Sequence, residues 1–237
     1  MCIFKNETMN LKVWLDHYIW QGVEHFYLID NGSSDQPLDI LKDYINKKLV
    51  TYIYKPEPYK QLEHYRSVFK SKTLKKESYW LIIADLDEFF YGLKNKIINI
   101  LPYLNKFDVV YCNWIMFGSN DLDDHPKDIR ISITNSNNKF HDNKKYIFKT
   151  NSIINPSQIQ IHKIDLVKRI YCGNSVIHLN HYPIQSKEYF KAVKIPRGDV
   201  NNRESNKIRN WEYFKQYDLD KIKKDDYLKS LIQKNFH

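Results

Sequence analysis

The sequence predicts an α/β fold with a mostly parallel central sheet flanked by helices. Two observations support this prediction: strand-like apolar runs alternate with segments of helical periodicity, and the runs show too little polar alternation to expose one face to water. With 237 residues, 42% of them hydrophobic, the chain is long enough for one substantial core and does not need a second domain.

The first part of the chain alternates strands with helices. Apolar residues recur at helical spacing from Thr8 until Gly22, a residue that suits the left-handed conformation at a helix end. YWLIIAD at 79–85 is the most apolar of the strand-like runs, so we expect it to be covered on both faces. We expect strands at 2–4, 23–30, 49–54 and 79–85, and helices at 8–22, 38–48 and 60–77.

The second part of the chain is less regular. A helix near 97–105 precedes a buried strand at 107–117, and residues 118–145 have the polar composition of a long surface excursion. Short apolar segments return at 147–185. SKEYFKAVKI at 186–195 has helical spacing with Ser186 as its N-cap, and the tail from Trp211 indicates one or two amphipathic helices.

The chain is basic, with a formal charge of +9, but its lysines are spread along the whole sequence. Codon bias or attraction to an anionic ligand would explain this charge, and we expect no nucleic-acid partner. Cys2, Cys112 and Cys172 form no close pair, which favours a reducing compartment. We find no signal peptide or membrane span in the sequence and therefore expect a cytoplasmic location.

Acidic residues follow two of the predicted strands directly. Asp30 ends one strand, and Asp85, Asp87 and Glu88 end another. Ligands of open parallel sheets bind beyond the carboxyl ends of strands, and paired carboxylates are costly there unless a cation neutralises them. Oxygen ligands select Mg²⁺ or Mn²⁺, which bridge carboxylates to phosphates. The alternative is that Asp87 and Glu88 open a helix, where acids favour the positive end of its dipole.

Five blocks of the sequence resemble glycosyltransferase family 92. They are KNE at 5–7, WLDHYIWQGVEHFYLIDNGSSD at 14–35, IADLDEF at 83–89, NWIMFGS at 113–119 and NHYPIQSKEYFKAVKIPRGD at 180–199. The resemblance implies a GT-A fold and inverting, metal-dependent transfer of a sugar, with galactose from UDP-galactose as the best-known case. On this view residues 1–237 form one domain, with a nucleotide-binding half at 1–90, an acceptor and metal half at 91–200, and C-terminal helices at 201–237.

The resemblance also assigns roles to single residues. Asp85, Asp87 and His181 match metal ligands for Mn²⁺ or Mg²⁺, and a neutral imidazole is a competent ligand. Lys194 and Arg197 match a basic stretch that meets the diphosphate of the UDP-sugar. The nucleotide pocket would comprise Lys5, Asn6, Glu7, Asp30, Asn31, Asp35 and Asp85.

Other side chains have two interpretations. Trp114 and Phe117 are either core residues or a stacking platform for the acceptor sugar, and Arg66 is either a solvated charge or a phosphate contact. His162 is either a core histidine or a site residue. An inverting transfer needs a base for the acceptor proton, about 3 Å from the acceptor oxygen. The candidates are Asp121 first, with the loop acids Asp123 and Asp124 beside it, then Asp199 and Glu88.

Two other functions fit parts of the pattern. A metal-dependent phosphodiesterase or nuclease would also use clustered acids, but it requires further acids at other strand ends. A non-catalytic carbohydrate-binding or RNA-binding module would keep the fold and, for RNA, would expose interleaved aromatic and basic residues. The sequence does not specify the donor sugar, the acceptor, the linkage or the number of subunits.

Overall fold

A computed structural model describes residues 1–198 and 208–235. Its strands are β1 Cys2–Phe4, β2 Phe26–Asp30, β3 Val50–Tyr54, β4 Trp80–Ile83, β5 Glu88–Gly92, β6 Val109–Phe117, β7 Asn135–Lys149, β8 Ile170–Cys172, β9 Ile177–His181 and β10 Lys223–Lys224. Its α-helices are α1 Thr8–Trp20, α2 Pro37–Asn46, α3 Gln61–Phe69, α4 Lys72–Glu77, α5 Ile97–Ile100, α6 Ile129–Ser132, α7 Lys187–Tyr189, α8 Ile195–Arg197, α9 Trp211–Asp218 and α10 Tyr227–Asn235. Short 3₁₀ turns lie at Leu101–Leu104, Thr150–Ser152 and Pro156–Gln158, and a π-helical turn, Phe190–Lys194, joins α7 to α8.

The strands form two sheets of different character. β1, β2 and β3 pair in parallel in that order, as expected for strands connected by α1 and α2. The second sheet has the order β10-β7-β6-β9-β5, with β4 paired to β7 and β8 paired to β6. Its β4–β7, β6–β7 and β5–β9 pairs are antiparallel, whereas β6 pairs in parallel with β8 and β9. The larger sheet is therefore mixed, and the mostly parallel central sheet that the sequence predicts is wrong for it; only the β1–β3 sheet is entirely parallel.

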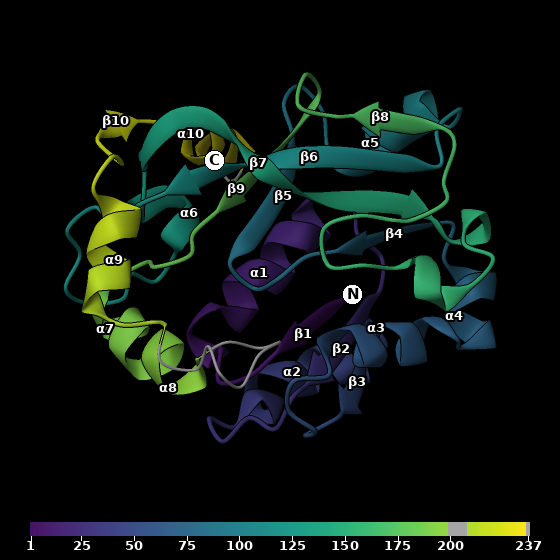
Figure 1. Cartoon of the computed structure of the whole chain (residues 1–237), viewed down its shortest axis with the longest axis horizontal. Coiled ribbons are helices and arrows are strands. Elements are labelled where there is room, and N and C mark those ends of the chain that lie inside the picture. The colour runs from purple at the N-terminus through teal and green to yellow at the C-terminus, as the bar shows by residue number, and fades with distance from the viewer. Residues whose placement is uncertain (199–207, 236–237) are drawn as a thin grey trace.

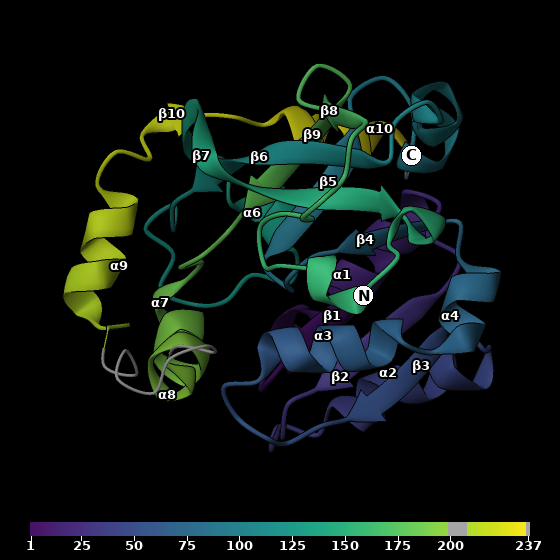
Figure 2. The same ribbon diagram turned by 45° about the vertical axis from the view of Figure 1, so that its right-hand side comes forward.

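The two sheets join where the N-terminus meets β4. The α-amino group of Met1 donates to the Ile82 carbonyl at 2.7 Å, and the Ala84 amide donates to the Met1 carbonyl at 3.3 Å. These two bonds have the pattern of parallel neighbours and tie the residue before β1 to the end of β4, a strand of the mixed sheet. Figures 1 and 2 show the β1–β3 unit below the mixed sheet, with the N-terminus between them.

Helix α1 anchors the main core. Leu11, Trp14, Leu15 and Tyr18 lie on one face at helical spacing, are buried, and pack in the same cluster as residues of β2, β5 and β6. Gly22 follows this helix with φ of +91°, which confirms the expected left-handed residue. A Cβ at this position would lie 2.4 Å from a carbon of Ile98. Both the positive φ and this close approach therefore favour glycine.

The expected polar excursion at 118–145 differs from the structure at its C-terminal end. Residues Asn135–Lys149 form β7, the longest strand, although its first half is exposed and rich in Asn and Lys. The strand forms because β4, β6 and β10 all pair with its backbone, a long-range effect that local composition does not reveal. The predicted helix at 60–77 is divided into α3 and α4. No helix within 1–198 or 208–235 is long and apolar enough to cross a membrane.

Candidate functional site

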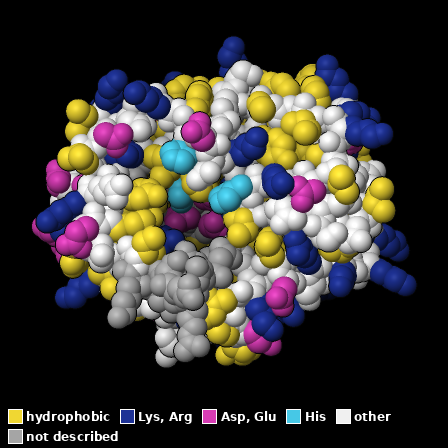
Figure 3. Space-filling view, in the orientation of Figure 1, with side chains coloured by type: hydrophobic (Ala, Val, Ile, Leu, Met, Phe, Trp, Pro, Cys, Tyr) yellow, Lys and Arg dark blue, Asp and Glu magenta, His cyan; other side chains and the backbone are white. Residues whose placement is uncertain are grey.

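A cavity of about 340 Å³ opens where the ends of β1, β2 and β4 face β6 and β9. Figure 3 shows this hollow, with histidines around acidic side chains. About half of the residues that the sequence assigns to a site lie in its wall. They are Lys5, Glu7, Asn31, Asp85, Asp87, Trp114, His162, His181, Lys194 and Arg197.

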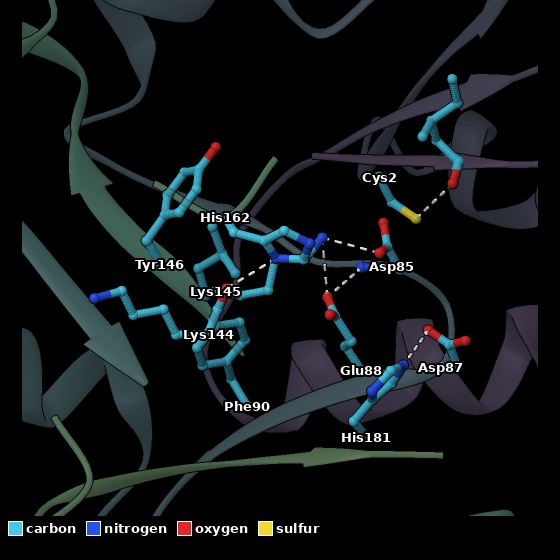
Figure 4. A network of polar contacts seen from close by, with 12 residues as sticks. Cys2, Asp85, Asp87, Glu88, Phe90, Lys144, Lys145, Tyr146, His162 and His181 are labelled. Carbon is cyan, nitrogen blue, oxygen red and sulfur yellow. Dashed lines mark hydrogen bonds and ion pairs between the residues drawn. The ribbon is translucent and has the colours of Figure 1, made fainter. Parts of the chain in front are cut away.

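Asp85 lies in the turn that follows β4, and its carboxylate is one-third exposed to the cavity. Its Oδ2 accepts a hydrogen bond of 2.9 Å from Nζ of Lys145, a fully buried residue of β7, and Tyr65 OH donates to its Oδ1 at 3.4 Å. Lys145 also lies 3.4 Å from Glu88, the first residue of β5 (Figure 4). Burial opposes the charge of Lys145, but Asp85 and Glu88 hold its pKa well above the usual range. Asp85 therefore forms an internal ion pair.

Asp87 is buried at the base of the same cavity. Lys194, from the π-helical turn, donates to its Oδ2 at 2.5 Å, and Nε2 of His181 lies 3.6 Å from its Oδ1. His181 reaches this position because it pairs with Glu88 of β5 and with Met116 of β6. Burial alone would raise the pKa of Asp87, but the Lys194 and His181 charges hold it well below the usual range. Burial lowers the pKa of Lys194, against the attraction of Asp87, but an ammonium at hydrogen-bond distance from a buried carboxylate retains its proton, so Asp87 is ionised and balanced by Lys194.

Glu88 begins a strand, so the alternative of a helix opened by Asp87 and Glu88 is wrong. Burial, together with the charges of Asp85 and Asp87, raises the pKa of Glu88 to about 8, although Lys145 opposes the shift. The side chain is fully buried and does not line the cavity. A protonated carboxyl away from the cavity is poorly placed to take a proton from an acceptor.

A second acid–cation pair lies at the start of α1. Glu7 accepts hydrogen bonds from Arg197 of α8 and, at 2.5 Å, from the hydroxyl of Tyr189. All three side chains are almost fully buried, and the pKa of Arg197 is raised by Glu7 against the opposing effect of burial. Since Arg197 and Lys194 are one helical turn apart, α7, the π-helical turn and α8 bring two cations to one side of the cavity.

Three histidines surround the indole of Trp114 in the cavity wall. The ring centroids of His181, His162 and His141 lie 4.2, 5.3 and 5.8 Å from the indole. Trp114 is 8% exposed, and among the described residues its Nε1 has no hydrogen-bond partner. Trp114 therefore packs in the core and also contributes to the cavity wall.

Other predicted nucleotide-site residues shape the loops beside the cavity instead of lining it. Asp30 accepts from the Ser33 amide at 2.7 Å and from Tyr52 OH at 2.6 Å. The Asn6 side chain accepts from the amide of Ser34 at 2.8 Å, and Asp35 accepts from the first amide of α1 at 2.9 Å. These contacts occupy the carboxylates and amide that the sequence assigns to the nucleoside, so their effect on a ligand would be indirect.

The remaining predicted residues lie elsewhere. Arg66 donates to the carbonyl of Ile159 at 3.0 and 3.1 Å and ties α3 to the loop that carries His162, so it is neither a free charge nor part of the cavity wall. Phe117 is 1% exposed and stacks on Tyr182, with ring centroids 4.7 Å apart, as a core residue. Asp121 lies in an exposed turn outside the cavity wall. Asp199 lies outside the described residues.

The acids do not fit a metal site formed by the protein alone. Within the described residues, no group of three or more His, Cys, Asp or Glu side chains is arranged to hold a metal ion. Asp85 and Asp87 each bind a lysine ammonium instead, Lys145 and Lys194 respectively. A cation at Asp87 would have to displace Lys194, which lies at hydrogen-bond distance.

Sequence reasoning missed several residues of the cavity wall. His141 comes from β7 in the segment that we expected to be a surface excursion. Tyr213 and Tyr217 come from α9, and Arg209 lies two residues before that helix. Lys145 also went unnoticed, although the aromatic and β-branched run YIF at 146–148 beside it is typical of a strand. No local signal shows that this buried lysine faces an acid 60 positions earlier.

The fold and this cavity define an α/β protein with a pocket, lined by paired acids and cations, at the ends of its strands. The family model described as Glycosyltransferase family 92 matches residues 1–229, so the chain belongs to this family of glycosyltransferases. No curated protein matches the sequence.

Two solved structures are similar at low identity. HddC from Yersinia pseudotuberculosis is 15% identical over 81% of this chain and 96% of that chain, with a TM-score of 0.44. S. aureus TarS, residues 1–349, in complex with UDP-GlcNAc is 12% identical over 91% of this chain and 70% of that chain, with a TM-score of 0.49.

Proposed function

We propose that this chain is a GT-A glycosyltransferase that moves a hexose, galactose above others, from a UDP-sugar to a hydroxyl of a glycan or other acceptor. The observation that carries the proposal is the convergence of Lys194 and Arg197 with Asp85 and Asp87 in one cavity at the strand ends. Two buried cations there suit a diphosphate, because both guanidinium and ammonium groups bind phosphate oxygens. Membership of a glycosyltransferase family makes a sugar nucleotide the natural source of that diphosphate.

The donor would lie with its nucleoside toward the ends of β1 and β2. Lys5 and Asn31 line this part of the cavity, and the amide of Asn31 donates to the carbonyls of Lys55 and Glu57 at 2.6 and 2.9 Å. Those contacts fix the loop against which the base or ribose would pack. Asp30, Asn6 and Asp35 would support this pocket by holding its turns in place.

The cations would stabilise the leaving group. In an inverting transfer, an acceptor oxygen forms a bond to the anomeric carbon as the bond from that carbon to the diphosphate breaks. The departing oxygen takes the electron pair, so negative charge develops on UDP. Lys194 is buried and the side chain of Arg197 is 12% exposed, and fixed charges in such a site are worth more than the same charges in water.

We also propose that the activity depends on Mn²⁺ or Mg²⁺. This prediction comes from the resemblance to the family alone. No step above depends on a metal, because the lysines already neutralise Asp85 and Asp87. The acceptor sugar would approach Trp114, whose indole would offer an apolar face. Phe117, in contrast, would only support β6 from the core.

A donor screen tests this function. The protein is incubated with UDP-galactose, UDP-glucose, UDP-N-acetylglucosamine, GDP-mannose and ADP-glucose, and nucleotide release is measured with and without Mn²⁺. We expect release of UDP, fastest from UDP-galactose, and NMR of the first product should show an inverted anomeric configuration. Turnover of none of these donors, together with a thermal shift caused by single-stranded RNA, would favour the binding-module alternative.

A further inference from the structure

The acids in the cavity wall are all paired, which leaves the proton acceptor of the reaction to another kind of residue. Glu7 binds Arg197 and Tyr189, Asp85 binds Lys145, and Asp87 binds Lys194. Proton transfer to any of these carboxylates would leave its cation buried without a partner, at a substantial cost in free energy. Within the described part of the chain, the cavity therefore lacks a carboxylate that is free to act as base.

The histidines around Trp114 remain as candidates in the cavity wall, and their hydrogen bonds distinguish them. Nδ1 of His141 accepts from the Asn143 amide at 3.0 Å, so the hydrogen of the neutral ring is on Nε2. His181 turns Nε2 toward the Asp87 carboxylate at 3.6 Å, which favours a hydrogen on that nitrogen. Neither ring directs an unprotonated Nε2 into the cavity.

His162 has the opposite tautomer. Its Nδ1 lies 3.1 Å from the backbone carbonyl of Lys144, and a carbonyl only accepts, so Nδ1 carries the hydrogen and Nε2 has a free lone pair. Among the described residues no group hydrogen-bonds to this Nε2. In Figure 4 the ring extends from the Lys144 carbonyl toward the side on which Asp85 lies, and His162 belongs to the cavity wall.

The surroundings of His162 keep this ring neutral and fixed. Burial, followed by the charge of Lys145, lowers the pKa of His162, against the opposing effects of the Lys144 carbonyl and Asp85. The ring packs edge-on against Trp114 at an interplanar angle of 83°. Its loop is held by Arg66, which donates to Ile159 and Gln160. A fixed, neutral imidazole with a free Nε2 is the state that a general base requires.

We propose that His162 is the general base of this enzyme, taking the proton of the acceptor hydroxyl on Nε2. The O–H bond of the acceptor breaks, its oxygen bonds to the anomeric carbon, and the electron pair of the glycosidic bond leaves on the UDP oxygen. The imidazolium then returns its proton to solvent. The inference rests on the proposed function, and it assigns to His162 the role for which the sequence offered Asp121, Asp199 and Glu88.

The first test is spectroscopic and needs no turnover. Long-range ¹H–¹⁵N correlation spectra of the ¹⁵N-histidine protein at neutral pH report which ring nitrogen is protonated, and the His162→Gln spectrum assigns the signal. We expect the Nδ1–H tautomer for His162. A ring protonated on Nε2, or on both nitrogens, would overturn the proposal.

The second test measures UDP release from UDP-galactose, with water as the acceptor. A general base contributes about 10²- to 10⁴-fold, so we expect His162→Gln to slow release by at least about 100-fold while the thermal shift with UDP is retained. Imidazole should partly restore the rate of His162→Ala. The matched control is His25→Gln, whose Nδ1 also lies 3.1 Å from a lysine carbonyl but outside the cavity, and it should leave the rate unchanged.

The outcomes separate the two proposals. If His162→Gln releases UDP within about threefold of the wild-type rate, or no longer responds to UDP, the role as base is wrong while the transferase proposal stands. If the wild-type protein neither responds to UDP nor consumes UDP-sugars, the proposed function itself fails.

Discussion

The ammonium of Lys194 lies 2.5 Å from the carboxylate of Asp87, although 107 positions separate the two residues in the sequence. Both side chains are buried, and the pair lies in the wall of the cavity to which we assign the sugar nucleotide. The aspartate of the Asp-x-Asp motif thus has an internal cation as its partner.

Removal of this cation should destabilise the protein strongly. Lys194→Met leaves the Asp87 carboxylate buried without its ammonium, and we expect the free energy of unfolding to fall by about 3–5 kcal/mol in urea titrations. Lys12→Met, which breaks an exposed pair with Asp16, should cost less than about 0.5 kcal/mol. The double variant Lys194→Met with Asp87→Asn should recover part of the loss. Equal costs for the two lysines would show that the buried pair is not formed.

Lys194 should also control metal binding at the motif. In the wild-type protein without nucleotide, the ammonium at Asp87 repels a second cation, so we expect Mn²⁺ to bind weakly. Lys194→Met leaves Asp87 and His181 facing each other at 3.6 Å, a pair suited to a divalent ion. Calorimetric titration with Mn²⁺ should show tighter binding to the variant. Identical binding to both proteins would contradict this view of Lys194.

The stability of the fold should depend on pH through Glu88. Burial raises the pKa of Glu88 from its ordinary 4.5 to about 8, so between these values the folded state holds a proton that the unfolded state releases. Its contribution to stability is full below pH 4.5 and is lost as the pH rises through 8. Glu88→Gln has no such loss, and its stability relative to wild type should increase from pH 5 to pH 9. A difference that is constant with pH would exclude this effect.

Trp114 and Phe117 should separate into a site residue and a core residue. Phe117→Ala removes a ring that is 1% exposed and stacked on Tyr182, and it should cost about 3–5 kcal/mol in unfolding free energy without changing UDP affinity below the transition. Trp114→Phe should instead lower the rate of sugar transfer. Unfolding free energy, UDP affinity and the rate of sugar transfer are measured for both variants. A loss of UDP affinity in folded Phe117→Ala would contradict the assignment of Phe117 to the core.

The sequence predicted the parts of this structure that depend on local pattern. Three short-range features located their elements correctly. The helical periodicity from Thr8 marks α1, Gly22 marks the end of that helix, and the apolar run before Asp85 marks β4. Of the acids at strand ends, Asp85 and Asp87 line the cavity, whereas Asp30 and Glu88 do not. Membership of glycosyltransferase family 92 is confirmed over residues 1–229.

The features that the sequence did not reveal depend on long-range pairing. β7 is a strand because three other strands pair with it, in spite of its polar first half. Lys145 and Lys194 reach the acids through that strand and through the π-helical turn, 60 and 107 positions away from them. The tautomer of His162 depends on a single carbonyl of β7. Local periodicity in the sequence does not show which residues so far apart in the chain come into contact.

The central claim is that the cavity beside Asp87, Lys194 and Arg197 binds the diphosphate of a sugar nucleotide. The most direct measurement is a crystal structure of the protein soaked with UDP. We predict phosphate oxygens within hydrogen-bond distance of Lys194 and Arg197, with the uridine toward Lys5 and Asn31. UDP bound elsewhere on the molecule, with both cations still held only by their acids, would contradict it.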